Sequence, residues 1–310
     1  MSTQSNVIRE PSVRSHGIAA AFIAPARLMY WSVRRELWEH RAIYVAPVAV
    51  ASVFLFGFLI SILHVLAEAH AAPWLDTMQQ RELFAQPYEF VEDLIMGTTL
   101  IVAMFYSVDA LHGEKRDRSV LFWKSLPVSD LITVLSKASI PILVIPLITF
   151  GITVATQFIM LLMSSVVLLM NGHSVWMIWS RLTPFQMWVM LLFHFLGIHG
   201  LWGSPIFGWL LLVSAWARRA PMLWAVLAPL AMGFGEKVAF NSTHFGNLIG
   251  SRFTGGSEGS AIMEHHMSMD PAFLLGPAHF LLNPGLWIGF AVTGVFLAAA
   301  VRVRRYRGPI

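Results

Sequence analysis

The sequence lacks cysteine altogether and contains little charge. With no cysteine among 310 residues, disulfides, thiolate metal sites and cysteine nucleophiles are excluded. Charged residues make up 12% of the chain, about half of the roughly 25% that is usual in soluble domains. Because 56% of the residues are hydrophobic, a water-soluble fold could not bury them all. The composition therefore predicts an integral membrane protein.

Two sequence motifs are also missing. No Gly-x-x-x-x-Gly-Lys-Ser/Thr stretch occurs, so the chain has no phosphate-binding loop, and any ATPase would be a separate polypeptide. No His-Glu-x-x-His zinc-protease motif occurs either. Residues 1–11 have no apolar core, and we expect no cleavable signal peptide. In such an apolar chain the formal net charge of +4 is first a topology signal, and we expect no nucleic-acid partner.

Six apolar stretches are long enough to span a bilayer, which needs roughly 20 residues each. The stretches are residues 43–66, 94–112, 138–168, 184–214, 220–240 and 285–301. Of the 21 Lys and Arg residues, 17 fall before the first span, after the second, after the fourth or in the tail. The positive-inside rule then places both termini in the cytoplasm.

The third and fourth spans carry distinctive boundaries. The stretch from Ala138 to Ser180 could form a hairpin of two spans, but that would send the basic tail outside. We interpret it as one long span, kinked by its prolines. Thr183-Pro184-Phe185-Gln186 reads as a capping box that begins the fourth span. The glycines within that span indicate close helix packing.

The second span looks short, because only 15 uncharged residues separate Asp93 from Asp109. At 1.5 Å per residue such a helix covers roughly 22 Å of a core about 30 Å thick. We therefore expect Asp109 or the Glu92–Asp93 pair to lie at depth, where Asp109 could pair with a basic residue of the following loop. The shallow charged residues are weak candidates for a transport pathway: Asp109, Glu236 and Lys237.

Histidine is the remaining candidate for metal chemistry. His194 and His199 are five residues apart, a spacing that puts them on different faces of an α-helix, so ordinary packing is expected. Met263-Glu264-His265-His266-Met267-Ser268-Met269 offers imidazole and thioether groups, which suit copper. A metal site at His265 and His266 is kept as the weaker alternative.

A charged insert lies between the second and third spans. Residues 119–126, taken as a helix, place Val120, Phe122, Trp123 and Leu126 on one face and Lys124 with Ser125 opposite. Pro127 ends this helix, and Asp130 is a good N-cap for the next. The insert either lies on lipid headgroups or offers a docking face to a soluble partner.

The insert also carries a family resemblance. Residues 109–130, Asp-Ala-Leu-His-Gly-Glu-Lys-Arg-Asp-Arg-Ser-Val-Leu-Phe-Trp-Lys-Ser-Leu-Pro-Val-Ser-Asp, resemble the first cytoplasmic loop of bacterial permeases of the type-2 ATP-binding-cassette exporter class. In that class this loop forms a coupling helix that docks on the ATPase subunit. The resemblance implies these ATPase-coupling residues: Glu114, Arg116, Asp117, Arg118, Phe122, Trp123, Lys124, Leu126, Pro127 and Asp130.

The resemblance further implies a quaternary organisation. Two permease copies would assemble with two ATPase copies in the bacterial inner membrane. This chain would hold no cofactor, while ATP and Mg would bind the partner ATPase. The expected function is the permease subunit of an exporter for an unidentified hydrophobic or amphipathic cargo, not an enzyme. A membrane-embedded enzyme or metal-handling protein that uses His265 and His266 is the alternative, and a structural or sensory scaffold is a third.

The expected fold is therefore all-α, with six transmembrane helices and three smaller features. Residues 1–42 form a cytoplasmic tail and an interfacial helix, in which Tyr30, Val33 and Leu37 make an apolar stripe and Arg35 pairs with Glu39. Residues 43–301 form the transmembrane domain, with the coupling loop at 113–130 and outer loops at 68–91 and 241–284. The second outer loop contains an expected re-entrant segment. Residues 302–310 form a basic cytoplasmic tail.

Overall fold

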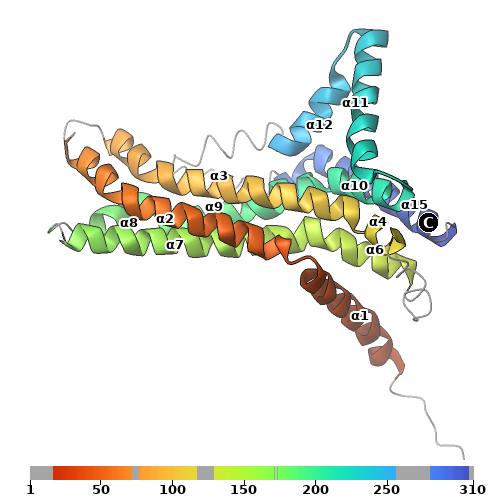
Figure 1. The fold of residues 1–310 in the computed structure, drawn as a ribbon, viewed down its shortest axis with the longest axis horizontal. Coiled ribbons are helices and arrows are strands. Elements are labelled where there is room, and N and C mark those ends of the chain that lie inside the picture. Colours follow the sequence, from red (N-terminus) through yellow and green to blue (C-terminus); the bar gives the residue numbers. More distant parts are fainter. Residues whose placement is uncertain are drawn as a thin grey trace, which may run out of the picture.

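The computed structural model is helical throughout the residues that it describes: 17–71, 77–116, 129–170, 172, 174–255 and 280–306. Figure 1 shows long helices running side by side, with α1 and α11 projecting from the bundle. The elements are α1 (Gly17–Glu39), α2 (Ala42–Ala71), α3 (Thr77–Asp109), α4 (His112–Arg116), α6 (Asp130–Ser139), η1 (Ile140–Val144), α7 (Ile145–Met170), α8 (Trp176–Leu182), α9 (Pro184–Phe193), η2 (His194–Trp202), α10 (Ser204–Trp216), α11 (Pro221–Phe240), α12 (His244–Thr254) and α15 (Pro284–Tyr306).

Six helical stretches in the described residues are long and apolar enough to cross a membrane, which confirms the predicted number. They are Ala42–Ile62, Ala85–Arg116, Asp130–Met170, Ile178–Trp202, Pro221–Phe240 and Pro284–Tyr306. Each overlaps one predicted span. The chain is a multi-pass membrane protein. We call the end of the bundle where α4, α6 and the last turns of α15 meet the loop end.

The second span is longer than the charge pattern predicted. Helix α3 runs for 33 residues, which at 1.5 Å per residue is about 50 Å, and it passes straight through Glu92 and Asp93. Tyr88, Val91 and Ile95 are all buried and share one helix face at i, i+3 and i+7, so the apolar face continues past the charged pair. The span is therefore longer than the predicted 94–112, and residues 77–91 of the outer loop 68–91 are helix.

The third span is a single long rod, as predicted, because Asp130–Met170 is one uninterrupted helical stretch. Its prolines lie at and beside a π-helical turn, η1, with Pro141 in the first turn. A π-helix leaves room for a residue that cannot donate the regular backbone bond, and such turns are rare and frequent at functional sites.

Helix α9 of the fourth span begins at Pro184, as predicted, but the apolar stretch already starts at Ile178, and the capping box does not form. Thr183 adopts a left-handed conformation with φ 41° and makes no side-chain cap bond. The span then changes to a second π-helix, η2, before Gly203 leads into α10. A Cβ on Gly200 would lie 2.3 Å from the carbonyl oxygen of Ile142. This glycine is what allows the two π-helices to touch.

Two large apolar cores, and a smaller cluster of Trp202, Phe280 and Leu286, stabilise the bundle. One gathers around the loop end, where Leu111, Val134, Leu211 and Ala300 are buried together. The other lies towards the α2–α3 hairpin and includes Tyr88, Met160 and Leu161. The clusters overlap the segments on either side of the two π-helices, which therefore lie in the middle of the bundle.

Helix α11 stands away from the bundle, and α12 folds back towards it (Figure 1). Ala225 is the one buried residue of α11, so its apolar surface faces whatever surrounds the chain. Arg252 of α12 donates to the carbonyl oxygen of Gly285 over 2.8 Å and stacks 4.4 Å from the ring centre of Trp202. Partial burial lowers the pKa of the Arg252 guanidinium. The expected re-entrant turn at 271–277 lies outside the described residues.

Helix α1 matches the expected interfacial helix in part. The pair Arg35–Glu39 is formed at 2.7 Å, and Val33 and Leu37 pack against the loop-end core. Tyr30 is 60% exposed, so of the predicted stripe only Val33 and Leu37 pack on this core. Arg34 lies 5.2 Å and 5.3 Å from the ring centres of the two exposed tryptophans at 31 and 38.

Candidate functional site

The structure describes the two ends of the 113–130 loop. Helix α4 carries Glu114 and the exposed Arg116, and α6 begins at Asp130. The remaining predicted coupling residues lie outside the described residues: Asp117, Arg118, Phe122, Trp123, Lys124, Leu126 and Pro127. Their roles stay predictions.

The first end of the loop is anchored to the C-terminal turns of α10. The Ser214 hydroxyl accepts hydrogen bonds from the backbone amides of Leu111 and His112, each at 2.9 Å. These two amides follow the end of α3, and the buried hydroxyl supplies their acceptor. The Lys115 ammonium donates to the carbonyl oxygen of Ala215. The short helix α4 is thereby held against α10.

The second end of the loop is fixed differently from the prediction. Asp130 was expected to cap α6, but Ser129 is the N-cap, and its hydroxyl accepts the Ile132 amide at 3.3 Å. Serine and aspartate cap comparably well, so the sequence alone does not choose between neighbours. Asp130 instead accepts a hydrogen bond of 3.0 Å from Arg304 Nε.

Arg304 joins the two ends of the loop to each other. Its Nη1 donates to Glu114 Oε2 over 2.6 Å while its Nε contacts Asp130. Glu114 Oε1 also lies 3.2 Å from the Lys137 ammonium. That ammonium in turn donates to Glu36 Oε1 over 2.7 Å. We call these five side chains, Glu36, Glu114, Asp130, Lys137 and Arg304, the ion network.

The ion network is buried. Lys137 is 2% exposed, Glu36 3%, Arg304 4% and Glu114 9%; the Asp130 side chain is 27% exposed. Taking such charges out of water costs several kcal/mol per ion, and the cost is offset only when partners and hydrogen bonds are well placed. The short charge-assisted contacts satisfy that condition. Removing one of these side chains would leave its partner as an uncompensated charge buried away from water.

Glu36 brings helix α1 into the network. Besides Lys137, it accepts the Tyr106 hydroxyl at 2.9 Å, and His40 lies 3.8 Å away. The rings of His40 and Tyr106 pack edge to face with centres 4.9 Å apart. The network thus ties α1, α4, α6 and α15 together with the end of α3. A displacement of the loop would be passed to the first and last helices through contacts that are costly to break.

Sequence reasoning missed three members of this network: Glu36, Lys137 and Arg304. It treated Lys137 and Arg304 as topology charges only, and Glu36 not at all. Glu36 and Lys137 are 101 residues apart, so no local spacing reveals the pair. A faint signal did exist, because Lys137 follows Asp130 by two helical turns on the face that carries Val134.

The predicted pathway residues do not gather in one place. Asp109 is half-buried at the end of α3, and no ion pair joins it to another described residue. The buried ion pairs nearby are made by Glu114, with Lys137 and Arg304 from outside the loop. Glu236 accepts hydrogen bonds from Ser242, at 2.6 Å, and from the first backbone amides of α12. It acts as a helix cap there. Lys237 is exposed on α11.

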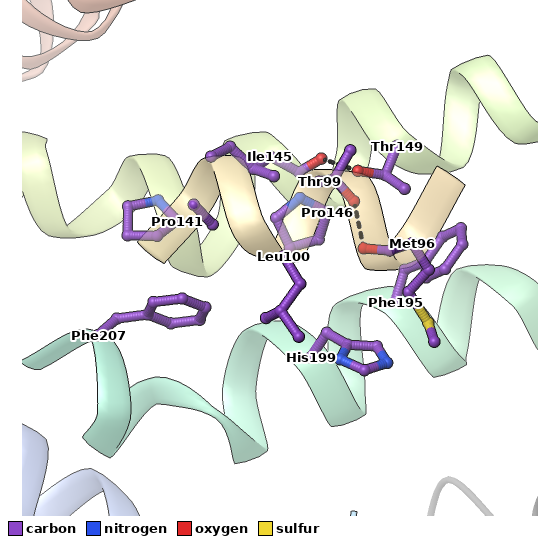
Figure 2. Close-up of a pocket in the computed structure, with 11 residues that line it drawn as sticks. Met96, Thr99, Leu100, Pro141, Ile145, Pro146, Thr149, Phe195, His199 and Phe207 are labelled. Atoms are coloured by element: carbon purple, nitrogen blue, oxygen red, sulfur yellow. Dashed lines mark hydrogen bonds between the residues drawn. The ribbon is translucent and has the colours of Figure 1, made fainter. Parts of the chain in front are cut away.

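A small cavity lies where the two π-helices meet α3 (Figure 2). Its lining includes Met96, Thr99, Pro146, Thr149 and His199. Its volume of about 20 Å³ holds one water-sized occupant. In this conformation the cavity therefore has no room for a bulky cargo.

The prediction that His194 and His199 face apart was wrong. Their Nε2 atoms are 3.3 Å from each other and their ring centres 5.1 Å apart. The prediction assumed 3.6 residues per turn, whereas a π-helix closes its turn at i, i+5 and stacks these positions. His265 and His266 lie outside the described residues, so their metal role stays a prediction.

No protein-family model, no curated protein and no solved structure matches the chain.

Proposed function

We propose that this chain is the membrane-spanning permease subunit of an ATP-driven exporter. ATP and Mg would bind a separate ATPase subunit, present in two copies alongside two permease copies in a bacterial inner membrane. The cargo class that suits the chain is hydrophobic or amphipathic, given 22 Phe, 12 Trp and 16 Met. The proposal rests on the resemblance of residues 109–130 and on the ion network.

One observation supports a mechanical role for the 113–130 loop. Arg304 contacts Glu114 at one end of the loop and Asp130 at the other. A loop that only lay on headgroups would not require buried charges at both ends. A loop that receives force from a partner needs stiff anchors, and buried charge-assisted hydrogen bonds resist displacement.

In this mechanism the ATPase moves the loop and the ion network passes the movement on. One path of contacts runs from Glu114 through Lys137 to Glu36, and so to α1. A second path of contacts runs from Glu114 to Arg304 in α15, and α15 packs closely on α10. The π-helix η1 follows α6 and the π-helix η2 precedes α10. They give the third and fourth spans a place to bend.

The test is co-purification with nucleotide hydrolysis. The tagged chain is purified together with any nucleotide-binding subunit that it captures, and hydrolysis by the purified complex is measured in lipid. We expect Trp123→Ala and Asp117→Ala to reduce capture of the ATPase and its stimulated hydrolysis at least tenfold. Lys237→Ala, an exposed change on α11, is the matched control and leaves both unchanged.

Two results would contradict the proposal. One is a purified chain that captures no nucleotide-binding subunit at all. The other is an activity that survives Trp123→Ala and Asp117→Ala but is lost in the double variant His265→Gln/His266→Gln. The second result would favour the metal-handling alternative.

A further inference from the structure

The π-helix η2 builds a pair of imidazoles in the middle of the bundle. His194 and His199 come from successive turns of one element, and their Nε2 atoms approach to 3.3 Å. His194 is 7% exposed. Two nitrogen ligands that each lie about 2.0 Å from a tetrahedral ion are separated by about 3.3 Å. The spacing of the pair is therefore that of two ligands on one metal ion.

The cavity that His199 lines supplies both space and a third donor. Met96 of α3 lines the same cavity as His199 (Figure 2). The hydroxyls of Thr99 and Thr149 also line it, and they donate to carbonyl oxygens of their own helices. With about 20 Å³, the cavity fits one ion or water molecule.

The donor types and the lack of nearby acids select the ion. Among the described residues no third His, Cys, Asp or Glu joins the pair, so a thioether is the remaining protein ligand. Imidazole with thioether favours monovalent copper. The energy of transferring an ion from water into an apolar medium rises with the square of its charge, so a buried site with only neutral ligands costs less for a monovalent ion than for Zn²⁺.

We propose that His194, His199 and Met96 bind a single monovalent copper ion at the junction of the two π-helices. The site is independent of the proposed exporter function, because it requires no ATPase. The sequence holds a second set of the same donors, Met263, His265, His266, Met267 and Met269. Any test must therefore separate the two sets.

The test titrates the purified full-length chain in lipid nanodiscs with Cu(I) under ascorbate, in competition with a chromogenic Cu(I) chelator. The background variant His265→Gln/His266→Gln removes the second set of imidazoles. In that background we expect one Cu(I) per chain, and at least a tenfold higher Kd after His199→Gln or His194→Gln, with a smaller rise after Met96→Leu. Gel filtration and helical circular dichroism verify that each variant is folded.

X-ray absorption on the background variant gives a readout that does not depend on further substitutions. The expected copper shell has two nitrogens at about 2.0 Å and one sulfur at about 2.3 Å. Three results would overturn the proposal: no Cu(I) bound in the background variant, binding unaffected by His199→Gln and His194→Gln, or tighter binding of Zn²⁺ than of Cu(I). In the first two cases the two rings are only a hydrogen-bonded pair, and in the third they belong to a zinc site.

Discussion

At the scale of single residues, Lys137 is a central member of the ion network, because it contacts the two most buried carboxylates of that network, those of Glu36 and Glu114. Lys137→Met would leave Glu36 and Glu114 without their shared ammonium while keeping the volume of the side chain. We expect the free energy of unfolding to fall by about 3–5 kcal/mol. Denaturant titration in detergent, followed by tryptophan fluorescence, measures it.

Arg35→Met is the matched control for this prediction. Like Lys137→Met, it breaks a 2.7 Å contact between a basic side chain and a glutamate. Here, however, the two side chains, Arg35 and Glu39, are 35% and 47% exposed. Exposed pairs contribute about 0–1 kcal/mol. Adding Glu36→Gln to Lys137→Met should restore part of the lost stability, because a neutral amide needs no counter-charge. Equal losses for Lys137→Met and Arg35→Met would refute the burial argument.

At the scale of elements, the contact between η1 and η2 depends on the absence of a side chain at residue 200. Gly200→Ala would place a Cβ 2.3 Å from the carbonyl oxygen of Ile142, and the two π-helices would have to separate. Overpacking of this kind costs about 1–3 kcal/mol. We expect a lower unfolding temperature, measured by thermal denaturation in detergent.

Gly151→Ala in α7 is the control, because a Cβ there meets nothing within 4 Å. Alanine is the better helix former by about 0.5–1 kcal/mol, so this variant should be as stable as the parent or slightly more stable. If Gly200→Ala behaves like Gly151→Ala, the close approach of the π-helices does not matter for stability.

The elements also show how far sequence reasoning reaches. Apolar length alone locates the six spans, because the bilayer imposes it. The π-helices are different, because hydropathy does not reveal a π-helical turn. The two imidazoles of His194 and His199, five residues apart, were therefore predicted on different faces of an α-helix, whereas the π-helix brings them together. Likewise, Arg304 meets Glu114 across 190 residues. Tertiary contacts of that range follow from packing, which composition and local spacing do not encode.

At the scale of the whole molecule, orientation in the membrane is a prediction that the lack of cysteine makes simple to test. Single substitutions Tyr306→Cys and Thr243→Cys place the only thiol at exposed positions at the end of α15 and beside α12. The positive-inside rule predicts that a membrane-impermeant maleimide labels Thr243→Cys in intact spheroplasts. Tyr306→Cys should be labelled only after permeabilisation. The reverse pattern would invert the topology.

The long reach of Arg304 also has a consequence for synthesis. Translation at roughly 5–20 residues per second delivers Lys137 within about 5 s of Glu114. Arg304, 190 residues beyond Glu114, follows only after about 10–40 s. The nascent chain must therefore hold Glu114 with one partner while four more spans are made. Among the six spans, the one that carries Arg304 is made after the other five, so the loop gains its contact with Arg304 only after those spans have been made.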